Sequence, residues 1–215
     1  MNKRYGFDKQ KLDEKSVSKN PFEQFGQWYA DATALCGEDG SAMSLATVSS
    51  NKPSIRTVFL RGFDKNALPD GRQGFCFYTN YNSRKGKELA ENKNACLLFF
   101  WKELQRQVKI EGRVEKLSAK ESDNYFASRA RGSQIGAWSS PQSEIISNRE
   151  TLEQWVKEFS KMFKGKKIPR PIHWGGYRLI PSLIEFWQGR ENRLHDRIVF
   201  TKQKSGKWKT ERLSP

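Results

Sequence analysis

Short runs of β-branched and aromatic residues, separated by Gly, Pro, Asn and Asp, recur along most of this chain and limit the folds open to it. Such runs are typical of β-strands, and the separators are typical of turns. The absence of regular strand–helix alternation predicts a mainly β fold, a small antiparallel barrel with peripheral helices. We expect strands within residues 43–50, 54–63, 74–80, 95–101, 106–117, 173–180, 182–189, 193–202 and 207–213, with a tight turn at 204–206 before the last.

Helix start signals mark three further segments. In each, a side chain that can cap a helix stands three positions before a Glu, which is the pattern of a capping box. The pairs are Asn20 with Glu23, Ser118 with Glu121, and Ser147 with Glu150, and they predict helices over residues 20–36, 118–129 and 147–165. Pro21, at the first helical position, strengthens the first of these predictions.

Length and polarity predict one domain preceded by an arm. A chain of 215 residues buries roughly 70% of its unfolded surface when it folds, which is enough for a core. Residues 1–19 are polar and predict a mobile arm, and residues 20–215 predict a single domain. Three widely spaced cysteines favour a reducing compartment. Without an apolar run near the roughly 20 residues of a membrane span, we expect a cytoplasmic protein that does not engage a membrane.

The net charge of +15 and the isoelectric point near 9.8 favour an anionic partner. Lys and Arg are interleaved with Asp and Glu along the chain, which argues against a nucleic-acid-binding tail. A basic barrel that stacks single-stranded nucleic acid on exposed aromatic rings is an alternative. We consider it weaker because most of the aromatic residues stand at core periodicities.

A phosphate ligand would need side chains here, because neither of the usual glycine-rich phosphate loops is present. The segment 77–92 predicts a strand and then a helix capped by Asn82 or Ser83, with Arg84 and Lys85 in its first turn. Cations in a first turn oppose the helix dipole unless an anion binds the free amides there. A solvated helix end is the alternative interpretation.

Two more arginines flank the apolar strand 54–63. Strand periodicity puts Arg56 and Arg61 on opposite faces, so they serve one ligand only if a bulge or the strand end intervenes. Otherwise one is an exposed Arg and the other a structural ion pair. Gln107 points away from the face shared by Val108 and Ile110 and could meet a polar heterocycle, although an exposed Gln is commoner.

The segment EFWQGRENRLHDR, residues 185–197, carries the densest group of basic side chains. If residues 193–202 are a strand, then Arg193, His195 and Arg197 share one face. Such a set repels itself unless an anion or a nearby acid neutralises it. His195 could instead be a satisfied core histidine. With only two histidines in the chain and no ligand spacing around them, no metal site is expected.

Together these segments resemble the pyridoxamine 5′-phosphate oxidase family over nearly the whole chain from about residue 20. The motifs that carry the resemblance are IRTVFLRGF, FYTNYNSRKGKELAEN, RQVKIEGRVEKL, YFASRARGSQIGAW, WGGYRLIP, EFWQGRENRLHDR and the terminal ERLSP. The resemblance implies an FMN-binding split β-barrel, antiparallel, and a homodimer with FMN in each of two clefts at the subunit interface.

The resemblance also implies roles for individual residues. Those that correspond to flavin contacts are Arg56, Arg61, Tyr78, Thr79, Arg84, Lys85, Gln107, Gln142, Ser143, Trp187 and Arg197. Those that correspond to substrate contacts are Tyr125, Arg129 and Ser133 at the phosphate, Arg193 and His195 at the ring, and Arg61 at both ligands. Arg193 and His195 are the expected catalytic pair, and no metal is implied.

The implied reaction is the oxidation of pyridoxamine 5′-phosphate and pyridoxine 5′-phosphate to pyridoxal 5′-phosphate, with dioxygen reduced to hydrogen peroxide. The chain departs from the family pattern at two places. Arg61 stands where Lys is expected, and Arg keeps the charge but not the reach. Arg4 directly precedes Tyr5, where the family has Arg-x-x-Tyr. A split-barrel FMN oxidoreductase for another anionic substrate is therefore an alternative.

Overall fold

The computed structural model describes residues 10–68 and 71–215, and the expectations about Arg4, Tyr5 and the first nine residues fall outside this part of the chain. In the described part, nine strands and five α-helices follow one another with three short 3₁₀ turns. The strands are β1 (Ala42–Ser49), β2 (Lys52–Phe59), β3 (Gly62–Phe63), β4 (Phe75–Asn80), β5 (Asn94–Trp101), β6 (Arg106–Lys116), β7 (Trp174–Gln188), β8 (Asp196–Lys202) and β9 (Trp208–Arg212). The helices are α1 (Pro21–Cys36), α2 (Arg84–Glu91), α3 (Ala119–Ser128), α4 (Arg131–Ser139) and α5 (Arg149–Met162), and the 3₁₀ turns are η1 (Gly37–Ser41), η2 (Lys102–Leu104) and η3 (Glu191–Arg193).

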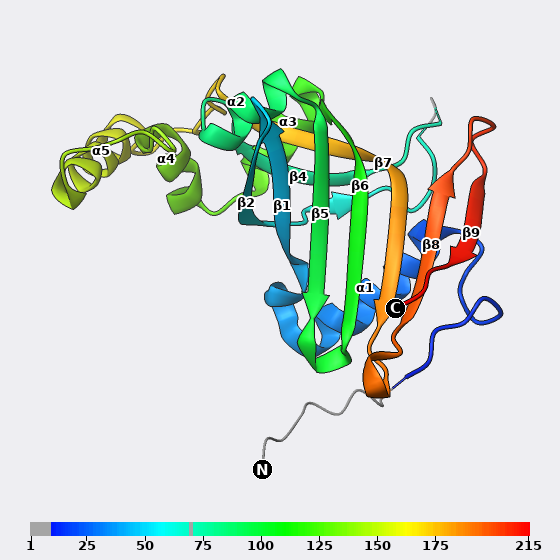
Figure 1. Ribbon diagram of the computed structural model, residues 1–215. Coiled ribbons are helices and arrows are strands. Elements are labelled where there is room, and N and C mark those ends of the chain that lie inside the picture. The colour runs from blue at the N-terminus through cyan, green and yellow to red at the C-terminus, as the bar shows by residue number, and fades with distance from the viewer. Residues whose placement is uncertain (1–9, 69–70) are drawn as a thin grey trace, which may run out of the picture.

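All nine strands belong to one antiparallel sheet, which curls around the core (Figure 1). The strand order is β2-β1-β5-β6-β7-β4-β3, with β8 on the free side of β7 and β9 on β8. The ladder does not close, because β2 and β3 at its two ends are joined through the chain at Leu60 and Arg61 rather than paired. The expected mainly β, antiparallel fold with peripheral helices is confirmed.

β7 is one strand of 15 residues where two strands were expected. It pairs with β6, β4 and β8, so it is the centre of the sheet. The register skips Ser182, since Glu111 pairs with Leu183 and Gly112 with Pro181. A Cβ on Gly112 would lie 2.1 Å from the carbonyl oxygen of Ile180, so only glycine permits this bulge. The bulge bends β7 into two arms (Figure 1).

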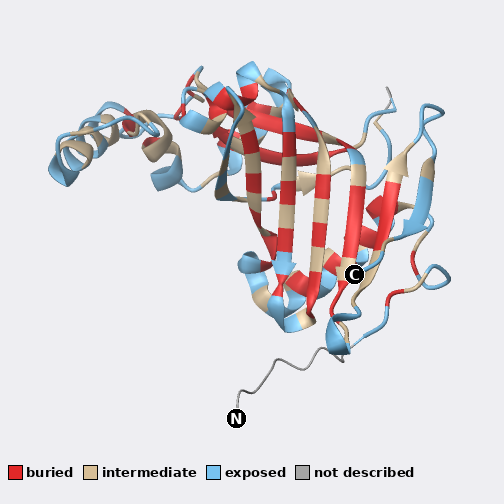
Figure 2. Ribbon diagram, in the orientation of Figure 1, coloured by how far each residue is buried: buried red, intermediate tan, exposed pale blue. Residues whose placement is uncertain are grey.

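The core lies inside the curled sheet and is covered by α1. Buried and partly exposed residues alternate along β1, β5 and β6, as Figure 2 shows by its red and tan bands. From α1, the ring of Phe25 packs edge-on against Phe75 and Phe99, with centroids 4.9 and 5.2 Å away. Full burial of one such side chain stabilises the fold by roughly 1.5 to 3 kcal/mol.

The helix caps follow the sequence in part. Asn20 caps α1 and Pro21 begins it, but the Glu23 carboxylate accepts a bond from Ser18 instead of closing a capping box. The box of Ser118 and Glu121 at α3 is confirmed. The expected box at Ser147 is wrong, because Asn148 accepts the Thr151 N–H and caps α5. α4 was not expected, since no side chain caps it.

Residues 10–19, expected within the mobile arm, are packed against the body. Leu12 and Val17 are buried in the main core cluster. Arg212 from β9 donates to the Glu14 carboxylate and to Asp196. The packed part of the chain therefore begins before residue 20. By contrast, α4 and α5 project from the sheet (Figure 1) and share a second apolar cluster with Phe126 and Trp174.

A buried arginine ties the β3–β4 connection to the centre of the sheet. The Arg178 guanidinium on β7 donates to Asp64 and to Glu121, each at 2.9 Å. Its side chain is only 6% exposed, so its charge depends on these two carboxylates. Burial opposes the charge of Glu121, but bonds from Ser118 and Arg178 lower its pKa overall.

Arg178→Ala should lower the free energy of unfolding by about 3 to 5 kcal/mol, because it leaves two acids without their buried partner. Urea unfolding followed by circular dichroism measures this loss. Arg149→Ala is the matched control, since Arg149 pairs with Glu153 on the exposed surface of α5, where such a pair contributes roughly 0.5 kcal/mol. Equal losses in the two variants would contradict the role of Arg178.

Candidate functional site

A cavity of about 790 Å³ lies where β2, β4, α2, α3 and α4 meet. Pockets of a few hundred to roughly 1,000 Å³ are typical of small-molecule and cofactor sites. We call it the cationic cavity, and its lining residues are Arg56, Thr57, Val58, Phe59, Arg61, Tyr78, Thr79, Asn80, Lys85, Tyr125, Arg129, Ala130, Ser133, Gly136, Ala137, Ser140, Gln142 and Trp174.

The charged side chains that line the cavity are all basic, and two of them, Arg56 and Arg61, pair with carboxylates outside the lining. Four cations line it, and none of its described lining residues is Asp or Glu. The cations are Arg56, Arg61, Lys85 and Arg129. Because like charges around one space repel, this arrangement favours an anion inside it.

At one end, the helix α2 presents Lys85 to the cavity. Ser83 caps α2 by accepting the Gly86 N–H. Of the two alternatives that the sequence offered, Asn82 and Ser83, it is therefore Ser83 that forms the cap. The Lys85 ammonium lies 3.4 Å from the Thr79 hydroxyl and 3.3 Å from the side-chain oxygen of Gln142, both neutral. Burial, and then the charge of Arg56, lower the pKa of Lys85. The structure thus brings together Lys85, Thr79 and Gln142, three residues that the family resemblance assigned to the flavin.

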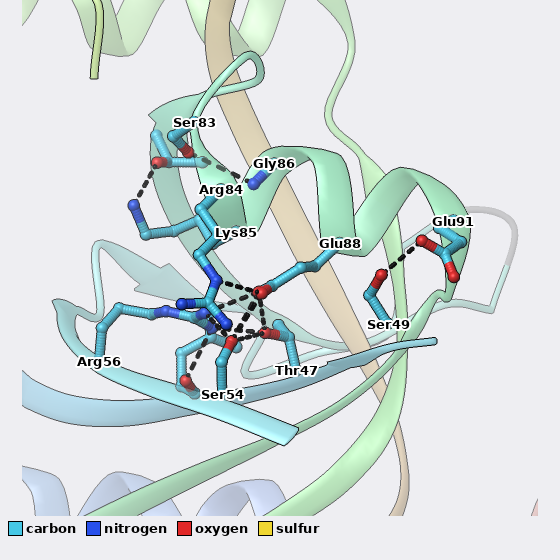
Figure 3. Close-up of polar contacts among 12 residues, drawn as sticks. Thr47, Ser49, Ser54, Arg56, Ser83, Arg84, Lys85, Gly86, Glu88 and Glu91 are labelled. Carbon is cyan, nitrogen blue, oxygen red and sulfur yellow. Dashed lines mark hydrogen bonds and ion pairs between the residues drawn. The ribbon is translucent and has the colours of Figure 1, made fainter. Parts of the chain in front are cut away.

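Beside Lys85, the carboxylate of Glu88 on α2 anchors two arginines (Figure 3). Glu88 accepts bonds from Arg56 at 2.7 Å and from Arg84 at 2.9 Å, and from the hydroxyls of Thr47 and Ser54. Burial opposes its charge, but these four groups together lower the pKa of Glu88 from 4.5 to about 2. Glu88 is a functional neighbour that sequence reasoning missed, because Arg56 is 32 residues away from it.

Arg56 and Arg84 are therefore held differently from the sequence expectation. The terminal nitrogens of Arg56 also donate to the Leu45 carbonyl and to the hydroxyls of Thr47 and Ser54, so Arg56 offers the cavity mainly its charge. Arg84 does not line the cavity. Its side chain is 68% exposed and is tethered by its Nε to Glu88.

Arg61 reaches the same cavity as Arg56 because the strand end intervenes between them. β2 ends at Phe59, and the Arg61 N–H donates to the Cys76 carbonyl as the chain turns toward β3. The Arg61 guanidinium pairs with Glu38 at 2.9 Å and lies over the Phe59 ring at 4.9 Å. Arg56 and Arg61 can therefore contact one ligand, because the strand ends between them.

The other end of the cavity is formed by Arg129 and a stack of rings. The rings of Tyr78 and Tyr125 stack with centroids 3.8 Å apart, and Trp174 lies parallel to both. The Arg129 guanidinium lies 4.6 Å from the Trp174 ring, and its buried NH1 atom has no hydrogen-bond partner among the described residues. Burial is the main reason that the pKa of Arg129 is lowered.

Three other predicted residues form a row on a different part of the sheet. Gln107 on β6 pairs with Trp187 on β7, which pairs with Arg197 on β8. We call these three residues the outer row. Arg197 donates to the buried Glu185 at 2.7 Å, and that bond raises the pKa of Arg197. None of the three lines the cationic cavity of its own chain.

The expectation that Arg193, His195 and Arg197 share one face of a strand is wrong. β8 begins at Asp196, and Arg193 ends the turn η3 with φ at 63°, next to Asn192 at 55°. Two successive left-handed residues break the strand periodicity. The His195 ring instead lies 4.6 Å from Trp187, beside the outer row, and its Nδ1 accepts the Arg190 N–H. Burial, and then the charge of Arg193, lower the pKa of His195, which favours the neutral ring.

The structure thus divides the predicted site into two places. Nine predicted residues line the cationic cavity: Arg56, Arg61, Tyr78, Thr79, Lys85, Tyr125, Arg129, Ser133 and Gln142. Seven do not: Arg84, Gln107, Ser143, Trp187, Arg193, His195 and Arg197. Ser143 follows Gln142 in a turn and has a left-handed φ of 72°. Trp174 also lines the cavity, although the sequence analysis assigned it no role at the site.

The described residues contain no group of acidic, His and Cys side chains able to hold a metal ion. None of the helices in this part of the chain is both long and apolar enough to cross a membrane.

These features describe a mainly β protein with a cation-lined cavity for a small anionic ligand, and comparisons with known proteins agree with that class. Residues 30–163 match the family described as pyridoxamine 5′-phosphate oxidase, and residues 174–215 match the pyridoxine 5′-phosphate oxidase C-terminal dimerisation region. The chain therefore belongs to the pyridoxamine 5′-phosphate oxidase family, an oxidase family.

Individual relatives support this assignment. A pyridoxine/pyridoxamine 5′-phosphate oxidase of Trichormus variabilis is 53% identical over 95% of this chain and 92% of its own length. An enzyme of the same name from Burkholderia thailandensis is 50% identical over 99% of this chain and 97% of its own length. The structure of PhzG from Burkholderia lata in complex with tetrahydrophenazine-1-carboxylic acid is 30% identical, with a TM-score of 0.87, over 98% of this chain and 100% of that one. The structure of a pyridoxamine 5′-phosphate oxidase-related, FMN-binding protein from Nostoc punctiforme has the same fold at 17% identity. Its TM-score is 0.72 over 93% of this chain and 100% of that one.

Glu88→Gln should lower the free energy of unfolding at pH 7 by up to about 3 kcal/mol, since the folded pKa of Glu88 lies near 2. A carboxylate with a depressed folded pKa stabilises the fold above its unfolded pKa. The difference between wild type and variant should therefore shrink as pH falls from about 4.5 toward 2. Urea unfolding across this range measures it. The control is Glu91, an exposed residue of the same helix that accepts bonds from Ser49 and Ser50, at the end of β1 and just after it. Glu91→Gln should lower the free energy of unfolding by less.

Proposed function

We propose that this protein is an FMN-dependent oxidase that converts pyridoxamine 5′-phosphate and pyridoxine 5′-phosphate to pyridoxal 5′-phosphate. The observation that carries the proposal is the cationic cavity, with four cations and no acid among its described lining residues. FMN and the substrate each carry a terminal phosphate, so two anionic groups would share that cavity. The family and the names of its curated relatives support this substrate class.

The residues present fit an FMN phosphate at one end and a substrate phosphate at the other. Lys85, with Thr79, Gln142 and the charge of Arg56, would hold the FMN phosphate, because the hydrogen-bond partners of Lys85 among the described residues are neutral. Arg129, Ser133 and Tyr125 would hold the substrate phosphate, because the buried NH1 of Arg129 needs an acceptor. Charge-assisted bonds to phosphate are among the strongest that these side chains make.

FMN, when bound, would accept a hydride equivalent from the substrate carbon and return the electrons to dioxygen, which becomes hydrogen peroxide. The protein's own groups would bind and orient the substrate and exclude water. Arg193 and His195 would act at the substrate ring. His195 is held by the bond from the Arg190 N–H to its Nδ1, so the neutral ring carries its proton on Nε2 and presents a donor.

A homodimer would unite the two halves of the predicted site. β7 carries Trp174 of the cavity and Trp187 of the outer row at its two ends. At about 3.3 Å per residue along two bent arms, these ends lie on the order of 30 Å apart, too far for one small ligand. A second copy would place its outer row and its His195 opposite the cavity. The match of residues 174–215 to a dimerisation region supports this arrangement.

A flavin oxidase for another anionic substrate is the second candidate. The observations that favour it are Arg61 in place of the expected Lys and the likeness to PhzG, which was solved with a carboxylic acid. A carboxylate carries less charge than a phosphate, so it would need fewer of the four cavity cations.

An anaerobic absorption titration tests the proposal. Purified protein loaded with FMN should show a flavin band that is bleached by pyridoxine 5′-phosphate and restored by oxygen, with one hydrogen peroxide formed per turnover. A protein that binds no FMN, or whose bound flavin only another anionic substrate reduces, would rule the proposed reaction out.

Lys85→Met should weaken FMN binding by roughly 10- to 100-fold, because a phosphate loses a charge-assisted partner worth about 1.5 to 3 kcal/mol. Riboflavin, which lacks the phosphate, should lose much less. Fluorescence titration of FMN-free protein measures both affinities. Lys87→Met removes an exposed cation from the same helix and should leave both affinities unchanged. Equal losses for FMN and riboflavin would place the phosphate elsewhere.

Mixed dimers test the shared site. Arg129→Ala and Arg193→Leu should each abolish most turnover, because each removes a cation from the substrate. A dimer with one chain of each kind would keep one site with neither substitution. Two affinity tags allow the mixed dimer to be purified, and its turnover should approach half that of wild type. Turnover no higher than in the single variants would mean that Arg129 and Arg193 of one site come from the same chain, which would contradict the shared site.

A further inference from the structure

Two arginines in the described part of the chain lie over tryptophan rings, yet their other contacts differ. The Arg106 guanidinium lies 4.5 Å from the Trp28 ring and donates to Gln188, Asp31 and Gln10. The Arg129 guanidinium lies 4.6 Å from the Trp174 ring, but its side chain makes no hydrogen bond or ion pair within the described residues. Arg106 is thus a structural group with filled donors, whereas Arg129 lines the cavity and its NH1 donor has no partner among the described residues.

Trp174 is fixed in place before any ligand binds. It is 6% exposed and begins β7, where it pairs with Asn80 of β4. Its backbone N–H donates to the Pro171 carbonyl, and its backbone carbonyl accepts from the Arg170 side chain at 2.6 Å. The parallel rings of Tyr78 and Tyr125 add packing beside it. The indole therefore offers a rigid face at the wall of the cavity.

We propose that Trp174 is a positioning residue that holds the Arg129 guanidinium for the substrate phosphate and so favours phosphorylated over unphosphorylated substrates. The inference rests on the proposed function, since it assigns a role in that same site. Trp174 would act through Arg129 rather than on the reacting atoms.

An aromatic face suits this task better than a carboxylate. A carboxylate would neutralise Arg129 and occupy the N–H groups that the phosphate needs. A ring attracts the cation through its quadrupole and leaves both the charge and the N–H donors available. Because Arg129 is ordered in advance, substrate binding spends less free energy on fixing a long side chain.

Steady-state kinetics of the FMN-loaded protein, with Trp174→Leu, Trp174→Phe and Trp28→Leu, test the inference. Trp174→Leu should raise KM for pyridoxine 5′-phosphate about tenfold, which corresponds to ~1.4 kcal/mol, with kcat changed less than about twofold. The inhibition constant of inorganic phosphate should rise by a similar factor. Trp174→Phe keeps a weaker ring and should raise both constants only about threefold. The dissociation constant of FMN, measured by titration of FMN-free protein, should stay near the wild-type value.

Trp28→Leu is the matched control, because it removes a buried ring under an arginine outside the cavity. It should reduce stability without changing KM or phosphate inhibition. The inference is overturned if Trp174→Leu leaves both constants unchanged, if FMN affinity falls in proportion, or if Trp28→Leu has the same effect on KM. If Trp174→Leu does not fold, Trp174→Phe decides, and an unchanged KM overturns the inference. Wild-type protein that does not oxidise pyridoxine 5′-phosphate contradicts the proposed function itself.

Discussion

Four cations around one cavity, without an acid among its described lining residues, are the constraint on which the rest of this structure depends. Each cation is held in place by a different kind of contact. Glu88 anchors Arg56, Glu38 pairs with Arg61, neutral oxygens meet Lys85, and an aromatic face carries Arg129. These supports keep the charges in place and leave a net positive space. An anionic ligand completes that electrostatic balance, which is why an anion-binding function follows from the geometry.

The long strand β7 connects this cavity to the remainder of the predicted site. Its first residue, Trp174, lines the cavity, and Trp187 near its other end belongs to the outer row. Because both are fixed on one strand, the two groups cannot close on each other within a chain. The same rigidity that positions Arg129 through Trp174 therefore makes a second copy necessary in the proposed function.

The sequence predicted what depends on local patterns. Most of the strand runs, the cap at Ser83 and the capping box at Ser118 are confirmed, because each depends mainly on neighbouring residues. Nine of the residues that the family resemblance named line one cavity in the structure. Features that depend on distant contacts were missed: the continuity of β7 requires Gly112 against Ile180, and Glu88 meets Arg56 from another element. Arg193 is left-handed without being a glycine, so the strand was expected to begin there rather than at Asp196.

A crystal structure of the protein grown with FMN and pyridoxal 5′-phosphate tests the central claim most directly. The account predicts a dimer with the FMN phosphate beside Lys85 and Arg56 and the second phosphate against Arg129 and Ser133. It also predicts that the partner subunit's outer row closes each cavity. FMN bound away from the cationic cavity, or two phosphates held without Lys85 and Arg129, would contradict it.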